Sequence, residues 1–218
     1  MKKIVWALLF LFVFSSTVYA EDSPKFGVGV RVGHNFYKDG NINLSGSGAS
    51  IGGDYSNKSV WMYGINGTYR HNDYFSLELA LDRTIKSQSD FKAGGTSWNT
   101  GDIQQMPLTL TARFHWPIGN FSPYVGAGLG YYWNSYDQNN TFWNPAAVVS
   151  MDNSVGYHVN AGSEFFLDAT KNLALNLDFK YVWNKADITA TNAGAGVRLT
   201  GSMNLDSFVV GLGIKYYF

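Results

Sequence analysis

The sequence contains no cysteine among its 218 residues. This absence excludes a disulfide framework, a cysteine-ligated metal site and a lipid-modified N-terminal cysteine. Neither sign of charge is in excess, because 16 Lys and Arg residues balance 16 Asp and Glu residues. A chain without a basic surplus gives no reason to expect nucleic acid as a partner.

A long apolar segment is missing beyond the first twenty residues. The chain starts with Lys2 and Lys3, continues through the apolar residues 4–14 and then reaches Val18-Tyr19-Ala20. This apolar stretch is shorter than the roughly 18 to 20 residues that a membrane-spanning helix needs. It is therefore more typical of a cleaved secretory signal peptide than of an anchor helix. We expect a signal peptide at 1–20 and one mature domain at 21–218.

The chain is rich in glycine and aromatic residues, and polar and apolar residues alternate along it. It holds 24 Gly and 14 Tyr, and 17% of its residues are aromatic. In the first segment, Val28, Val30 and Val32 alternate with Gly29 and Arg31. A period of two predicts a strand with one apolar and one polar face. Eight segments show this period, at residues 26–37, 58–70, 74–87, 102–117, 121–136, 154–167, 173–188 and 207–218.

The links between these segments alternate in length. Residues 71–73, 118–120 and 168–172 form tight links, whereas the other four links are long and rich in Gly, Ser, Asn and Thr. Outer-membrane barrels combine short periplasmic turns, long external loops and two aromatic girdles. A soluble β-sandwich alternates too, but it has no reason to show this asymmetry. We predict an all-β fold: an eight-stranded antiparallel transmembrane β-barrel in the cell outer membrane, with short periplasmic turns and long external loops.

The inward faces of the predicted strands carry charges of both signs. An isolated charge away from water is costly, so these side chains should pair inside a narrow barrel. We expect Arg113 to lie within ion-pair distance of Glu78, Asp82 or Glu164. Such a network either plugs the interior or lines a conduit, and the sequence leaves both open. The proposed interior polar network consists of Arg31, Arg70, Glu78, Asp82, Arg113, Glu164, Asp178, Lys180 and Lys215.

The long external links also contain apolar residues. Two interpretations are open: an apolar funnel that admits a hydrophobic molecule, or a loop cluster that shields itself from water. The residues are Trp98, Phe142, Trp143, Val148 and Met151, together with Pro145 and Val149.

Catalysis has little support in the sequence. A lipid-modifying barrel enzyme needs an activated serine or histidine near the external surface. Only His34 and His158 are placed to approach a serine there, since His71 lies in a tight link and His115 lies near the periplasmic end. No metal-ligand cluster or phosphate-binding loop is present, and we expect no catalytic residue and no cofactor.

Several segments together resemble the OmpW family of eight-stranded outer-membrane barrels, and the resemblance covers nearly the whole mature chain. It implies a monomeric barrel that passes small hydrophobic molecules inward through an internal channel, with a lateral exit into the membrane. The segments are residues 106–110, 113–114, 123–128, 173–183, 187–191 and 205–206.

The leading functional hypothesis is therefore passive uptake of small hydrophobic compounds. The first alternative is a structural or surface-receptor barrel whose plugged interior conducts nothing, and the second is a lipid-modifying enzyme. Expected partners are outer-membrane lipid and lipopolysaccharide, small hydrophobic ligands, and the barrel assembly machinery. The last would recognise the alternating aromatic residues Tyr216 and Phe218, which partly resemble the C-terminal assembly signal of such barrels.

Overall fold

The computed structural model describes residues 25–143 and 147–218. The predicted signal peptide at 1–20 and Pro145 lie outside the described residues. Strands β1 to β14 belong to one sheet, with a short 3-10 helix, η1 (Ala193–Ala195), near one end of it. Over these residues, no helix is long and apolar enough to cross a membrane.

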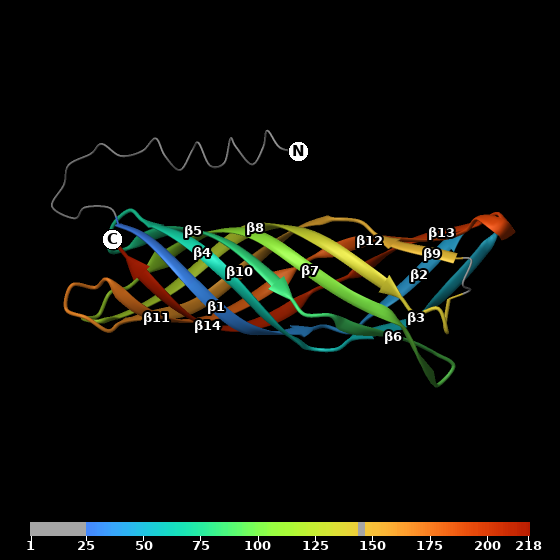
Figure 1. Ribbon diagram of the computed structural model, residues 1–218, viewed down its shortest axis with the longest axis horizontal. Coiled ribbons are helices and arrows are strands. Elements are labelled where there is room, and N and C mark those ends of the chain that lie inside the picture. The colour runs from blue at the N-terminus through green and yellow to red at the C-terminus, as the bar shows by residue number, and fades with distance from the viewer. Residues whose placement is uncertain (1–24, 144–146) are drawn as a thin grey trace.

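Eight antiparallel strands close into a barrel, as the alternation predicted (Figure 1). Closure joins the first and last strands, whose register runs from the Gly27–Tyr217 pair to the Tyr37–Ser207 pair. The eight strands are β1 (Lys25–Tyr37), β4 (Val60–Arg70), β5 (Phe75–Thr84), β7 (Thr96–His115), β8 (Phe121–Gln138), β10 (Ser154–Phe166), β11 (Leu173–Trp183) and β14 (Ser207–Tyr217).

The long external links are mostly β-structure, a feature that the sequence did not predict. Strands continue the barrel wall past the predicted strand ends, because apolar residues alternate in these segments too, as Ile42 and Leu44 do. The abundance of Gly, Ser and Asn conceals this period. The additional strands are β2 (Gly40–Gly46), β3 (Ala49–Asn57), β6 (Ser87–Ala93), β9 (Ala147–Met151), β12 (Lys185–Asn192) and β13 (Val197–Asn204).

Turn chemistry differs between the two ends of the barrel. At the hairpin end, Gly94 and Gly95 join β6 to β7 with φ angles of 56° and 79°, which glycine adopts without strain. At the other end, the Asn72 side-chain oxygen accepts hydrogen bonds from the Tyr74 and Phe75 amides, at 2.9 and 2.8 Å. Such side-chain bonds close a tight turn within a few residues.

The barrel has two halves that differ in what they bury. We call the half next to the tight turns the lower barrel and the half built by the hairpins the upper barrel. The lower barrel consists of β1, β4, β5, β10, β11, β14 and residues 107–115 and 121–133. The upper barrel consists of β2, β3, β6, β9, β12, β13 and residues 96–106 and 134–138.

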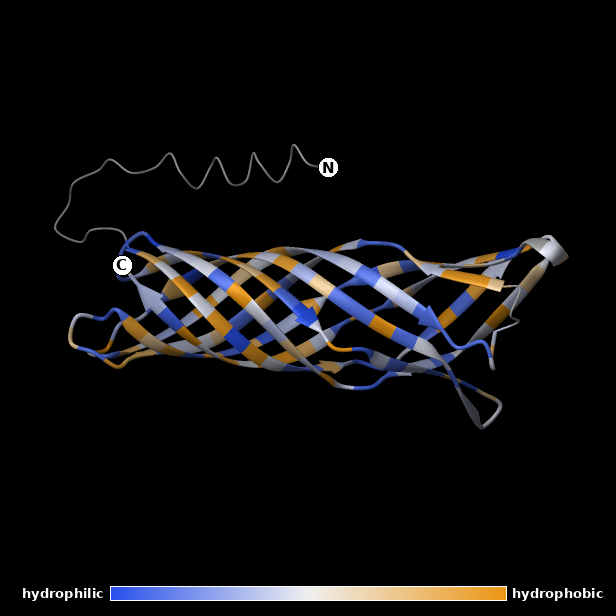
Figure 2. Cartoon of the chain, in the orientation of Figure 1, coloured by the Kyte–Doolittle hydropathy of each residue, from blue (hydrophilic) through white to orange (hydrophobic). Residues whose placement is uncertain are grey.

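The lower barrel is apolar outside and polar inside. Val30, Ile65 and Leu129 point outward and are 60%, 60% and 64% exposed, whereas Glu78 and Arg113 are each only 1% exposed. Alternating orange and blue bands along these strands show the two faces (Figure 2). Exposed aromatic residues gather near both ends of the apolar belt, with Trp61, Tyr63 and Tyr157 at the upper end and Trp116, Phe121, Phe165 and Tyr216 at the lower end.

The upper barrel is apolar inside. Its core contains side chains from the hairpins, from β9 and from the upper part of β7. Polar residues alternate with them and lie on the outer face. The buried cluster consists of Ile42, Leu44, Tyr55, Ile103, Val149, Met151, Ala186, Ile188, Ala190, Leu199, Met203 and Leu205. The same period of two therefore places polar residues inside the lower barrel and apolar residues inside the upper barrel.

Candidate functional site

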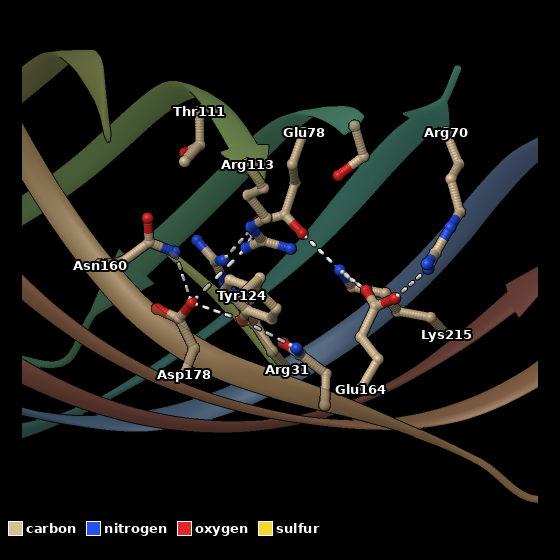
Figure 3. Close-up of polar contacts among 12 residues, drawn as sticks. Arg31, Arg70, Glu78, Thr111, Arg113, Tyr124, Asn160, Glu164, Asp178 and Lys215 are labelled. Carbon is tan, nitrogen blue, oxygen red and sulfur yellow. Dashed lines mark hydrogen bonds and ion pairs between the residues drawn. The ribbon is translucent and has the colours of Figure 1, made fainter. Parts of the chain in front are cut away.

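The centre of the lower barrel is an ion-paired cluster around Glu78 of β5 (Figure 3). One carboxylate oxygen of Glu78 lies 3.1 Å from the Arg31 guanidinium and 2.6 Å from that of Arg113, and its other oxygen lies 2.7 Å from Lys215 Nζ. These partners come from β1, β7 and β14. The side chains thus meet across the lumen, and the predicted pairing of Arg113 with an inward carboxylate is confirmed.

Glu164 of β10 extends this cluster toward the tight turns. Lys215 Nζ lies 2.9 Å from Glu164 Oε1, and Arg70 Nη1 lies 2.9 Å from Oε2. The Tyr217 hydroxyl donates a third bond to Oε1 at 2.8 Å. Lys215 therefore bridges Glu78 and Glu164, so the two carboxylates belong to one network.

Asp82 and Asp178 complete the network on its upper side. Asp82 pairs with Arg31. Asp178 lies 3.6 Å from Arg113 and accepts hydrogen bonds from Tyr124 Oη and Asn160 Nδ2, each at 2.7 Å. The network thus contains four cationic and four anionic side chains, and all eight are buried. Such a cluster excludes wide passage, because moving any member away leaves an uncompensated charge out of water.

Lys180 departs from the predicted network. It is buried, but no carboxylate of the described residues lies within 4.0 Å of its ammonium group. Instead it lines a cavity of about 40 Å³ directly above the cluster, a volume that holds only a few waters. The other walls of this cavity include Met62, Thr84, Gln105, Pro107, Tyr132, Val182 and Val209.

A second cavity, of about 50 Å³, lies in the apolar interior of the upper barrel. Phe142 and Trp143, two of the predicted funnel residues, line it, and the Trp143 indole N–H donates to the Thr100 carbonyl at 2.9 Å. The remaining walls are mostly apolar. They include Ile42, Leu44, Ile51, Tyr55, Phe91, Tyr136, Ile188 and Met203.

The other predicted funnel residues have different positions. Val149 and Met151 are buried in the apolar cluster. Trp98 is 40% exposed and lies at its rim, with its ring centroid 6.2 Å from that of Phe142. Val148 was placed wrongly: it is 66% exposed, because it alternates along β9 with two buried neighbours.

A break in the barrel wall lies at the junction of the two halves. The β5–β7 ladder ends at the Leu81–Leu108 pair, and pairing resumes between β6 and β7 only at Ser87–Ile103. We call the stretch between residues 82–86 and 104–107 the seam. It includes Pro107, which has no N–H to donate to a ladder.

Side chains hold the seam together in place of the ladder. Thr84 Oγ1 accepts from the Gln105 amide at 2.9 Å, and Gln104 Nε2 donates to the Thr84 carbonyl at 3.0 Å. On the outer surface, Arg83 Nη2 donates to Gln104 Oε1 at 3.3 Å. The seam lies level with the upper aromatic girdle, since the Ile85 amide bonds the Trp61 carbonyl at 3.0 Å.

The upper barrel is also joined weakly in two places. Strand β9 pairs with β12 alone, and the Gln138 side chain connects it to β8 through bonds of 2.8 Å to the Ala147 carbonyl and the Val149 amide. Strands β2 and β13 share a single ladder pair, Ser45 with Thr200. The hairpins can therefore separate at lower cost than the strands of the lower barrel.

The histidines lie away from the cavities of the upper barrel. His158 bonds Thr111 at 2.9 Å inside the lower barrel, and the His34 ring packs against Trp61. The serine–histidine contacts among the described residues both involve His115, which is buried and lies 2.8 Å from Ser76 Oγ and 3.3 Å from Ser122 Oγ. Sequence reasoning excluded His115 by its periplasmic-end position, and the structure places both contacts within the polar interior. No group of three metal-binding side chains occurs among the described residues.

An outward apolar belt with a girdle at each edge needs lipid around it, whereas the upper barrel, polar outside, needs water. The fold therefore defines a class, the small outer-membrane β-barrels, with the tight turns in the periplasm and the hairpins outside the cell. The model of the OmpW family matches residues 25–218. The chain belongs to this family and resides in the outer membrane.

Individual relatives agree with this assignment. Outer membrane protein W of Escherichia coli strain K12 is 24% identical over 228 aligned residues that cover all of both chains. The crystal structure of OprG from Pseudomonas aeruginosa superposes with a TM-score of 0.79 at 19% identity, covering 93% of this chain and 99% of OprG. The structure of AlkL in lipid bilayers gives a TM-score of 0.59 at 18% identity, covering 94% and 95%. The structural likenesses support the fold.

Proposed function

We propose that this barrel is a passive channel for small hydrophobic molecules, which enter the upper barrel from outside and leave sideways through the seam. The observation that carries the proposal is the change in the interior at the junction. An apolar interior lies above a charged cluster, and the wall lacks its ladder where the two meet. An apolar solute gains nothing by crossing the ionic cluster, because it would have to separate hydrated or paired charges.

Entry requires the hairpins to move. The two cavities hold about 40 and 50 Å³, whereas pockets for small organic ligands enclose roughly 300 to 1,000 Å³. The single Ser45–Thr200 ladder pair and the Gln138 side chain are joints of the upper barrel with little or no backbone ladder. Opening there would admit a solute to the Phe142 and Trp143 side chains without disturbing the lower barrel.

The proposal is tested by locking the seam. The natural chain has no cysteine, so the double variant Thr84→Cys with Gln105→Cys introduces a single pair that oxidation can join. We expect oxidation to slow uptake of a fluorescent naphthalene derivative into liposomes carrying the refolded barrel, by about tenfold for a closed exit. Reduction should restore the rate in the same sample.

The matched control is Ser45→Cys with Thr200→Cys, which joins two positions that are already paired. Its oxidation should reduce uptake if the hairpins open between β2 and β13, and should leave it unchanged if they open beside β9. Uptake that equals that of empty liposomes in every sample would refute the channel. If oxidation of the Thr84→Cys and Gln105→Cys double variant does not slow uptake, the lateral exit is refuted.

A surface receptor is the second candidate, and one observation favours it. Ile51, Trp98 and Val148 expose 43%, 40% and 66% of their surface in the upper barrel, outside the lipid belt. Apolar side chains that gather into a patch facing water mark a contact with a protein partner. Absence of uptake, combined with an unchanged fold, would favour this receptor function over the channel.

A further inference from the structure

Arg83 is an unusual charge for a barrel wall. On β4 and β5 the other charged side chains, Arg70, Glu78 and Asp82, are buried inside. Arg83 points outward and is exposed at the level of the upper girdle, where it pairs in register with Tyr63. It therefore lies where the outer leaflet meets water.

The guanidinium of Arg83 has no counter-ion within the part of the chain that the structure describes. Among the described residues no carboxylate lies within 4.0 Å of it, and its one side-chain bond is the 3.3 Å contact with Gln104 across the seam. By contrast, Lys86 just above it lies 2.5 Å from Asp137. A guanidinium offers five N–H donors, so most of those on Arg83 are free to bind an anion.

The surface around Arg83 is amphipathic. Beside and below it, Tyr63, Ile65 and Leu81 form an outward apolar strip, with 55%, 60% and 36% exposure. Above it lie the ammonium groups of Lys58 and Lys86. An outward-facing arginine over an apolar strip complements a lipid that carries phosphate on its headgroup, because arginine binds phosphate through parallel N–H bonds.

We propose that Arg83 binds the headgroup phosphate of an outer-leaflet lipid, whose acyl chains lie along Tyr63, Ile65 and Leu81. Phosphate binding draws the guanidinium away from Gln104 and removes the outer side-chain bond across the seam. Lipid occupancy thereby regulates the opening of the wall. The binding site stands independently of the channel, whereas its regulatory role rests on the proposed function.

The site is tested by measuring lipid binding to the refolded full barrel in detergent with native mass spectrometry. The probes are bisphosphorylated lipid A, the same lipid without phosphates, and inorganic phosphate. Arg83→Gln should weaken lipid A binding about tenfold. The matched control is Arg198→Gln, which removes another exposed arginine, on β13 far from the lipid belt, and it should bind like the natural chain.

Three results would overturn the site. These are equal loss in Arg83→Gln and Arg198→Gln, equal binding of the dephosphorylated lipid, or displacement of lipid A by an equal concentration of inorganic phosphate. Heat-dependent gel migration verifies that Arg83→Gln still forms the closed barrel. Should that variant not fold, Arg83→Lys serves instead, because it keeps the charge but loses the paired donors and is expected to bind more weakly.

Regulation of the seam has a separate readout that needs no transport. The Gln105 amide bonds Thr84 Oγ1 inside the seam, so its hydrogen exchange reports opening. Lipid A should speed this exchange in the natural chain and leave it unchanged in Arg83→Gln. Unchanged exchange in the natural chain would overturn the regulatory role, whereas faster exchange without any uptake would refute the channel and leave the lipid site standing.

Discussion

The lower and upper barrels share the same period of two, and β7 and β8 run through both, yet their interiors are opposite. Arg113 and Glu78 are buried in the lower half, whereas Ile103 and Ile188 are buried in the upper half. The difference follows from the surroundings. In the lower barrel the outer face of each strand contacts lipid and is apolar, so polar groups point inward. In the upper barrel the outer face contacts water and is polar, so apolar groups point inward.

The halves also differ in how they are held closed. Each pair of neighbouring strands in the lower barrel has a continuous ladder, and ion pairs join opposite walls. The upper barrel has an apolar core but incomplete ladders, with Gln138 serving in place of a backbone pair. A rigid lower half can therefore support an upper half that opens.

The largest effect should come from removing the shared anion of the lower barrel. Glu78→Ala leaves Arg31, Arg113 and Lys215 without their common partner, and we expect a loss of about 3–5 kcal/mol in the free energy of unfolding. Urea titration of the barrel in lipid vesicles measures it. Asp90→Asn, on the outer side of β6, is the control and should leave the midpoint in place. A loss below about 1 kcal/mol for Glu78→Ala would show that the cluster is not a structural plug.

A matched pair of lysine substitutions tests whether lipid surrounds the lower barrel and water surrounds the upper barrel. Val30 and Val148 are 60% and 66% exposed in the lower and upper barrels. Val30→Lys should cost about 2–4 kcal/mol because it places a charge in lipid, whereas Val148→Lys should stay within about 0.5 kcal/mol. Unfolding in vesicles measures both. Equal costs would mean that the two residues face the same medium, and the proposed membrane boundary would be wrong.

The smallest effect concerns a tyrosine of the upper core. Burial raises the pKa of Tyr55 to about 12, although its hydroxyl donates to the Asn204 carbonyl. The neutral form is favoured in the folded state, so its contribution to stability is complete below about pH 10, the pKa of an unfolded tyrosine, and is lost as the pH rises through 12. We expect the Tyr55 Cζ resonance in NMR, assigned by its absence in Tyr55→Phe, to titrate above pH 11. A midpoint near 10 would show that the upper core admits water.

Much of the lower barrel could be predicted from the sequence because lipid imposes a strict rule. Every strand there needs an apolar outer face, and the inward placement of Arg31, Glu78 and Lys215 follows from alternation alone. That these three would meet on one carboxylate could not be predicted. Their separations across the lumen depend on the tilt and stagger of all eight strands.

The upper barrel was harder to predict because two of its signals conflict. Ile42 and Leu44 alternate as strand residues do, but the neighbouring Gly, Ser and Asn residues favour a loop. Val148 was assigned to the funnel by its apolar character alone, without its register on β9. The seam was missed altogether, although Pro107 in the middle of a predicted strand is a signal for an interrupted ladder.

The ionic cluster also bears on how the chain is inserted. Arg31 lies on the first strand and Lys215 on the last, and both neutralise Glu78 of β5. Glu78 therefore gains its full set of partners only when the two ends of the sheet meet. A half-closed sheet would present unmatched charges to the bilayer, which makes closure an all-or-none step and favours folding of the whole barrel over partly inserted intermediates.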